Sequence, residues 1–245
     1  MMAKELPNID LHIHTLYSDG TSNVEDAIRQ AASNGLEAIA ITDHYHMIGT
    51  ERFGGYVSEI VSNSKRAPLR VLVGLEIHLQ GASIPLIGKN EHGIDLVLAD
   101  PIGGGADGLK ELRKNQILEY FAEAYSSICK NPEVDIIAHP LNLGRFDQFR
   151  LFSDIDPWLP EHLIKKAKEG NKYLEVMSGM SWWFPHSEVD RFTEEYAAFI
   201  RHGFDEGVSF SIGSDAHCVH GVGNTVWSRK ILSSVGATCD DIIKV

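Results

Sequence analysis

Short continuous runs of apolar residues recur along the chain, and a longer segment separates each run from the next. Uninterrupted apolar runs of this length are typical of strands that are buried on both faces of a parallel sheet. The pattern predicts seven strands, at Ile9–His12, Ala38–Ile41, Val71–Gly74, Leu96–Ala99, Ile136–Ala138, Leu174–Val176 and Ser209–Ile212.

The segments between these runs carry helix signals. Thr21 and Ser22 are N-cap candidates before a predicted helix at Asn23–Asn34, and Gly35 follows its end. Apolar residues recur at nearly helical spacing over Leu109–Cys129, which predicts one long helix. Three more helices are predicted, at Gly55–Arg66, at Glu161–Lys168 after Pro160, and at Ser187–His202 before Gly203.

Alternating strands and helices predict an α/β fold with a parallel sheet. Seven such units in 245 residues approach the size of a βα barrel, although an open doubly wound sheet gives the same pattern. No repeat or linker divides the chain, so we expect one domain over residues 1–245. The glycines at 103–105, with Gly108, lack the spacing of a phosphate-binding nucleotide loop.

Side chains that can bind metals follow five of the seven predicted strands. His12 and His14 end the first strand, and side chains two residues apart on a strand point the same way. In a βα barrel the carboxyl ends of all strands meet on one face, where active sites form. The other candidates are Asp19 in the following turn, His44 after the second strand, Glu76 after the third, His139 after the fifth, and Asp215 and His217 after the seventh.

A single histidine at a strand end is more often structural than a metal ligand, so the convergence of the set carries the inference. Five imidazoles and several carboxylates buried together without a metal would leave polar groups unsatisfied and carboxylates repelling one another. Imidazole nitrogen with carboxylate oxygen suits Zn, Mn or Fe better than Mg or Ca alone. Cys218, next to His217, is expected to be a small apolar residue rather than a ligand.

Charge and cysteine content narrow the function classes. The chain has 22 Lys+Arg against 34 Asp+Glu, a formal net charge of −12, which argues against a partner held mainly through nucleic-acid phosphates. The three cysteines are odd in number and form no CxxC pair, which favours a reducing compartment. Neither a signal peptide within Met1–Leu11 nor a membrane-spanning run is apparent, so we expect a cytoplasmic protein.

The order and spacing of these motifs resemble those of the PHP (polymerase and histidinol phosphatase) family. That resemblance implies a distorted seven-stranded (β/α)7 TIM-like barrel with two or three divalent metals at its C-terminal face. It also implies hydrolysis of phosphate esters by a metal-activated water. The motifs are Asp10-Leu11-His12-Ile13-His14, Thr42-Asp43-His44, Gly74-Leu75-Glu76, Ala138-His139-Pro140 and Gly213-Ser214-Asp215-Ala216-His217.

The resemblance also divides the candidate ligands among the metals. His12 and His14, with Glu76 and Asp215, would hold the first metal. Glu76 would bridge to a second metal, which His139 would also bind.

The third metal would be held by Asp19, His44 and His217. One position departs from the family, in which the fourth strand usually ends in a histidine ligand of the second metal. By spacing, that position is Ile102 here. Asp100 lies two residues earlier and either supplies the ligand or only caps the turn before Pro101.

The expected activity is hydrolysis of a phosphomonoester, on a small phosphorylated metabolite. His217 could assist the leaving group, and Arg145 is the best-placed cation for the phosphate, ahead of Lys89 and Arg52. Trp182 and Trp183 form either a wall for the organic part of the substrate or ordinary packing at the rim. The alternatives are a nuclease or oligonucleotide phosphodiesterase, a metal-binding module without catalysis, and amidohydrolase-like C–N cleavage.

Overall fold

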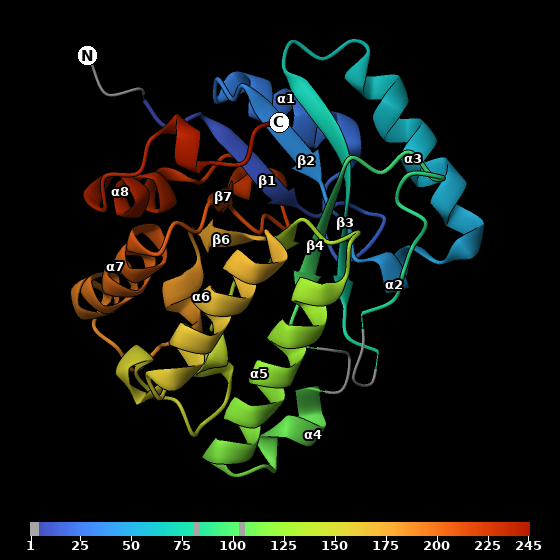
Figure 1. Cartoon of the computed structure of the whole chain (residues 1–245). Coiled ribbons are helices and arrows are strands. Elements are labelled where there is room, and N and C mark those ends of the chain that lie inside the picture. Colours follow the sequence, from blue (N-terminus) through green and yellow to red (C-terminus); the bar gives the residue numbers. More distant parts are fainter. Residues whose placement is uncertain (1–4, 81–83, 103–105) are drawn as a thin grey trace.

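The computed structural model describes residues 5–80, 84–102 and 106–245 (Figure 1). Its strands form one parallel sheet in which each strand pairs with the next along the chain. The strands are β1 Ile9–Ile13, β2 Ala38–Ile41, β3 Arg70–His78, β4 Leu96–Asp100, β5 Ile136–Ile137, β6 Tyr173–Met177 and β7 Phe210–Gly213.

The first and last strands come together and nearly close the sheet into a barrel. The amide of His14 donates to the carbonyl of Ala216 at 2.8 Å, and the amide of Ala216 donates to the carbonyl of His12 at 3.2 Å. These bonds confirm the predicted seven-stranded α/β barrel and rule out the open doubly wound sheet. The carboxyl ends of all the strands therefore face one mouth.

Helices cover the outside of the barrel (Figure 1). Their buried residues recur at helical spacing, as in the first helix, where Val24, Ala27, Ile28 and Ala31 face the sheet. Within the described ranges, no helix combines the length and apolar character that crossing a membrane requires. The helices are α1 Val24–Ser33, α2 Tyr45–Ile48, α3 Thr50–Ser64, α4 Ala106–Lys110, α5 Lys114–Lys130, α6 Trp158–Gly170, α7 Val189–Asp205 and α8 Val226–Ser234.

Several predicted boundaries were wrong, each for a local reason. The N-cap of α1 is Asn23, whose side chain accepts from the amide of Asp26 at 2.8 Å, rather than Thr21 or Ser22. The predicted helix at 109–129 is two helices, because the extended backbone of Arg113 interrupts it and caps α5. Helix α7 continues through Gly203 and stops before Gly207, which has a φ of +80°.

Two short helices escaped prediction, and one strand is longer than predicted. The four residues of α2 are too few to show a helical period, and α8 follows the last segment to which a helix was assigned. Strand β3 runs on to His78, so Glu76 lies within the strand rather than just after it. The glycines at 103–105 are outside the described residues.

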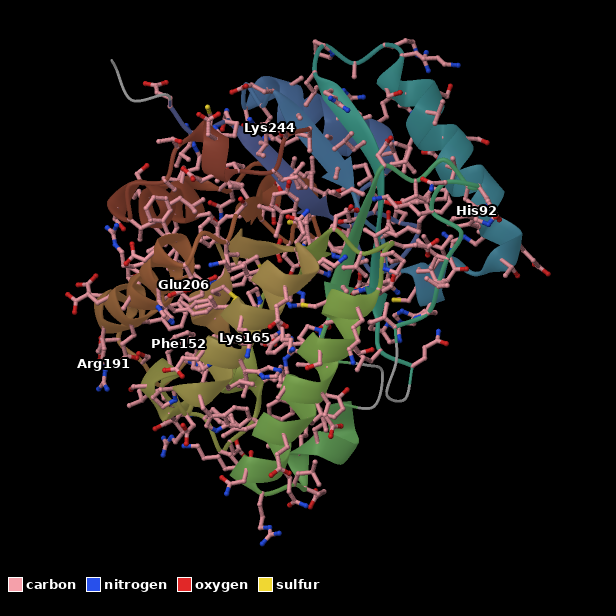
Figure 2. All side chains as sticks on the ribbon, viewed as in Figure 1. His92, Phe152, Lys165, Arg191, Glu206 and Lys244 are labelled. Carbon is pink, nitrogen blue, oxygen red and sulfur yellow. The ribbon has the colours of Figure 1, made fainter. Side chains whose placement is uncertain are left out.

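An aromatic layer joins the outer helices to the loops on one side of the barrel. Phe152 lies within it (Figure 2), and its ring centroid is 5.6–5.7 Å from those of Phe184, Phe192 and Tyr196. Edge-on contacts of this kind stabilise buried aromatic clusters by more than the burial of their apolar surface alone would. The charged side chains of Lys165, Arg191 and Glu206 point outward (Figure 2).

The buried carboxylate of Asp10 links β1 to the chain after β7 by hydrogen bonds. Its carboxylate accepts from the Ser214 amide at 2.9 Å, the Ser214 hydroxyl at 2.6 Å and the Gly223 amide at 2.8 Å. Burial raises the pKa of Asp10, and the hydrogen bonds from Ser214 and Gly223 partly offset that effect. The barrel thus closes over a buried carboxyl group that these donors, together with the His12 amide at 3.4 Å, satisfy.

We expect Asp10→Ala to lower the free energy of unfolding by about 2–4 kcal/mol, because it leaves two buried amides without an acceptor. Chemical denaturation monitored by circular dichroism measures the change. Asp26→Ala removes a carboxylate that pairs with Arg29 on the surface of α1, and should change stability by no more than about 0.5 kcal/mol. Equal effects of the two substitutions would contradict the role assigned to Asp10.

Candidate metal centre

The eight residues predicted as metal ligands all lie at the mouth of the barrel. Strand β1 carries His12 and the chain continues directly to His14, Glu76 projects from β3, and the other five lie on the loops that follow the strands. Their ligand atoms form three overlapping groups, and within each group the atoms lie within 4.8 Å of one another. The groups are His12, His14 and Asp215; His12, Glu76 and His139; and His14, Asp19, His44 and His217.

Two imidazole nitrogens and two carboxylate oxygens lie close together at the centre of the site. His12 Nε2 lies 3.0 Å from His14 Nε2, 3.3 Å from Glu76 Oε2 and 3.4 Å from Asp215 Oδ1. His14 Nε2 lies 3.3 Å from Glu76 Oε2 and 3.2 Å from Asp215 Oδ1. Ligands about 2.0 Å from a tetrahedral zinc ion are separated by about 3.3 Å. The spacings of His12, His14 and Asp215 therefore suit a zinc-sized cation, and Glu76 lies beside the same two nitrogens.

Glu175, which sequence reasoning missed, fixes the orientation of His12. Its Oε1 lies 2.8 Å from His12 Nδ1, and its Oε2 accepts from the His139 amide at 2.6 Å. A proton on Nδ1 of His12 leaves the lone pair of Nε2 free for a metal. A Cβ at Gly213 would lie 2.1 Å from Glu175 Oε1, so only glycine fits beside this carboxylate.

The second group is built on the other oxygen of Glu76. Glu76 Oε1 lies 3.1 Å from His139 Nε2, and the Asn142 amide nitrogen lies 2.9 Å from His139 Nδ1. Asn142 Oδ1 is buried without a partner. A half-turn of the Asn142 amide would let this oxygen accept a proton from Nδ1, and Nε2 of His139 would then be free to bind a metal.

Asp100 caps a turn at the edge of this group. Its Oδ1 accepts from the Ile102 amide at 2.8 Å and lies 4.0 Å from His139 Nδ1, whereas His139 Nε2 is the atom that faces Glu76. Asp100 belongs to none of the ligand groups among the described residues, and Ile102 is buried with the apolar core. The geometry favours the capping role of Asp100.

The third group is the most open to solvent. Asp19 Oδ2 lies 3.5 Å from His44 Nε2 and 3.3 Å from His217 Nε2. The side chains of Asp19 and His217 are about 40% exposed, whereas that of His12 is fully buried. Asp43 holds the turn that carries Asp19, by accepting from the amide and hydroxyl of Thr15 and from the hydroxyl of Ser18.

Burial and neighbouring charges strongly shift the pKa values of the side chains in these groups. Burial would lower the pKa of His12, but the carboxylates of Glu175, Asp215 and Glu76 raise it well above its usual value. For His14, burial opposes its carboxylate partners, which raise the pKa to about 9. Burial would raise the pKa of Glu76, but the imidazoles, His12 foremost, hold it well below its usual value. The carboxylates therefore carry full negative charge, which a metal would neutralise.

Strained backbone places two of the candidate ligands. His139 has a φ of +27° and Asp215 a φ of +57°, values that residues with a side chain rarely adopt. Strain of this kind persists where the surrounding structure holds it and is common at functional sites. Here the Glu175 bond to the His139 amide supplies part of that constraint.

Arg145 lies close to the metal-ligand groups. Its guanidinium is stacked over the Trp183 ring, 3.9 Å from the centroid, and its buried Nε has no partner among the described residues. Burial lowers the pKa of Arg145, while the carboxylates of Asp100, Glu76 and Asp215 act to raise it. Trp182, in contrast, is 76% exposed.

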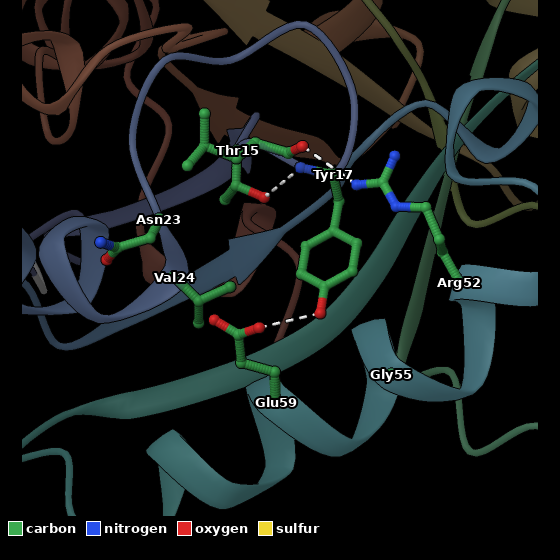
Figure 3. Close-up of a pocket in the computed structure, with 8 residues that line it drawn as sticks. Thr15, Tyr17, Asn23, Val24, Arg52, Gly55 and Glu59 are labelled. Carbon is green, nitrogen blue, oxygen red and sulfur yellow. Dashed lines mark hydrogen bonds between the residues drawn. The ribbon is translucent and has the colours of Figure 1, made fainter.

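The two other candidate cations lie elsewhere. Lys89 pairs with Asp135, whose carboxylate also accepts from the Val97 amide near the start of β4, away from the mouth. Arg52 donates to the Leu16 carbonyl at 3.0 Å, over the ring of Tyr17, at the edge of a cavity of about 380 Å³ between α1 and α3 (Figure 3).

Comparison with known proteins finds a family model and several relatives that match most of the chain. The PHP domain matches residues 10–181. A probable phosphatase of Acetivibrio thermocellus is 31% identical over 243 residues, which are 95% of this chain and 88% of the relative. A DNA polymerase/3'-5' exonuclease of Bacillus subtilis is 26% identical over 85% of this chain, but the match covers only 34% of that protein.

A solved structure shares the fold. The histidinol phosphate phosphatase of Lactococcus lactis, in complex with zinc, L-histidinol and phosphate, superposes with a TM-score of 0.71. The superposition covers 95% of each chain at 15% sequence identity. At this identity the likeness shows a common fold.

We expect Glu175→Gln to weaken zinc binding roughly 10- to 100-fold, because an amide can accept from only one of the two donors that Glu175 now satisfies. Competition with a chromophoric chelator measures the affinity. Glu59→Gln is the matched control, since Glu59 accepts from the Tyr17 hydroxyl outside the ligand groups. Unchanged zinc affinity in Glu175→Gln would show that His12 needs no such support.

Proposed function

Because this chain belongs to the PHP domain family, we propose that it is a metal-dependent phosphomonoesterase that acts on a small phosphorylated metabolite. The observation that carries the proposal is the close approach of His12, His14, Glu76 and Asp215 at the mouth of the barrel, where both histidine Nε2 atoms lie 3.2–3.4 Å from both carboxylates. The Glu76–His139 pair lies directly beside that set, so metals could bind on both oxygens of one carboxylate.

Two or three divalent metals, of Zn, Mn or Fe, suit the ligands present. The first group offers His12, His14 and Asp215, with Glu76 beside them, and the third offers His14, Asp19, His44 and His217. The second group offers Glu76 and His139, with His12 nearby. When bound, the metals would neutralise the charge of the phosphate and lower the pKa of water in the site.

Arg145 is suited to bind the phosphate group. A guanidinium matches the geometry of phosphate oxygens, and stacking on Trp183 holds its plane fixed near the ligand groups. Its unpartnered Nε can donate to a phosphate oxygen. We expect a phosphomonoester to lie between Arg145 and the metals, where positioning and charge neutralisation dominate phosphoryl transfer.

His217 is better suited to bind a metal than to protonate the leaving group. Its Nδ1 donates to the Asp215 carbonyl at 2.9 Å, which leaves the lone pair of Nε2 facing Asp19. The proton on Nδ1 is engaged and directed away from the third group. We therefore assign to His217 the role of ligand first.

Metal removal tests the activity directly. Protein treated with a chelator should lose phosphate release from p-nitrophenyl phosphate, and Zn or Mn should restore it. His12→Ala removes an atom common to two ligand groups, so it should lower the rate by more than about 100-fold and reduce the metal content measured by mass spectrometry. Full turnover by metal-free protein would refute the proposal, and faster cleavage of oligonucleotides than of monoesters would favour a nuclease.

Arg145→Gln tests phosphate binding. The loss of a charge-assisted hydrogen bond should lower kcat/KM by roughly 10- to 100-fold, mainly through a higher KM, and metal content should not change. Arg150→Gln, an exposed arginine beside His186, is the matched control. If both variants keep the KM of the unmodified protein, the phosphate is held by the metals alone.

A further inference from the structure

Two histidines outside the ligand groups extend the row of imidazoles beyond Glu76. Strand β3 continues two residues past Glu76 to His78, and side chains two apart on a strand share a face. Helix α2 lies beside this end of β3 (Figure 1). Its residue His46 meets His78 edge-on, with ring centroids 4.3 Å apart, and its ring centroid lies 5.5 Å from that of His44.

His46 and His78 have no structural partner in the described part of the chain. They make no hydrogen bond or ion pair there and belong to none of the ligand groups. His162, by contrast, lies 3.0 Å from the Ser126 hydroxyl and 3.1 Å from the Ala122 carbonyl, far from the mouth. Exposed His46 and half-buried His78 thus present free donor and acceptor nitrogens at the rim.

The buried base of the site determines which part of the substrate the ring nitrogens of His46 and His78 can contact. His12 and Glu76 are buried at the base of the ligand groups, so a phosphate bound there would direct its ester oxygen toward the mouth of the barrel. The alcohol part of the substrate then occupies the mouth. On the side formed by β2 and β3, His46 lies next to the candidate ligand His44, and His78 lies next to His46.

We propose that His46 and His78 recognise the alcohol part of the substrate through hydrogen bonds to a hydroxyl or amino group close to the ester oxygen. The protein accordingly prefers phosphomonoesters of polar alcohols to those of apolar alcohols of the same size. This inference rests on the proposed phosphomonoesterase activity. A site built to hydrogen-bond its substrate discriminates against an analogue without the polar group, because its own polar groups then lose their partners.

Matched pairs of substrates test this recognition. Glycerol 1-phosphate and propyl phosphate have three carbons each, and ethanolamine phosphate and ethyl phosphate have two, so each pair differs only in polar groups. We expect kcat/KM to favour the polar member of at least one pair by about tenfold or more. In His46→Ala and His78→Ala this ratio should fall to within about threefold of unity. His78→Asn, which keeps a donor and an acceptor, should retain part of the preference.

The control and the remaining readouts separate recognition from a structural role. His202→Ala, an exposed histidine at the end of α7, should leave the ratio and both rates unchanged. Metal content should stay constant in all variants. Three results would each overturn the inference: a decrease in kcat/KM by the same factor for both substrates of a pair, a loss of metal from the variants, or no preference for the polar substrate in the unmodified protein. If the unmodified protein hydrolyses no monoester of any kind, the proposed function itself is wrong.

Discussion

The carboxylate of Glu76 is the point at which the three ligand groups meet. One of its oxygens lies 3.1–3.3 Å from nitrogens of His12, His14 and His44, and the other faces His139. Removing such a charge from water is costly unless charged or hydrogen-bonding partners surround it. Four imidazoles surround this one, and they come from the ends of three different strands, β1, β2 and β5, which the closed parallel barrel brings together. The fold and the chemistry therefore depend on the same buried contact.

A second layer of buried carboxylates keeps the ligands in place. Glu175 holds the ring of His12 and the backbone of His139, Asp10 ties β1 to the chain after β7, and Asp43 holds the turn before Asp19. Each accepts from at least two donors that belong to the ligand-bearing segments. Orientation by outer partners sets both the tautomer of a metal-binding imidazole and its basicity. The excess of acidic residues in the chain thus includes carboxylates that support the site without being metal ligands.

The features of the fold and of the site that depend on local sequence patterns could be predicted from the sequence. The apolar pattern led to a parallel α/β sheet of seven strands, and the placement of polar residues at strand ends led to all eight residues that the structure gathers at the mouth. The choice of a closed barrel over an open sheet came from the resemblance to the PHP family. Glu175 was missed because its only signal is one acidic residue inside an apolar run, and its partner His12 is 163 residues away. Whether Asp100 binds or caps depends on which ring nitrogen of His139 it faces, and side-chain orientation across strands leaves no trace in the spacing of residues.

Solvent exposure of the ligand side chains increases from the first ligand group to the third, and this difference distinguishes the two groups. The first group lies on buried residues, so its charges must be balanced by one another and by metal. The third group includes Asp19 and His217, which water can reach and partly screen. The first group therefore lies where the fold itself fixes its ligands, and the third group lies where solvent reaches them. Arg145, stacked on Trp183, is itself largely buried and interacts with the carboxylates of Asp100, Glu76 and Asp215, so it adds a fixed positive charge near the buried groups.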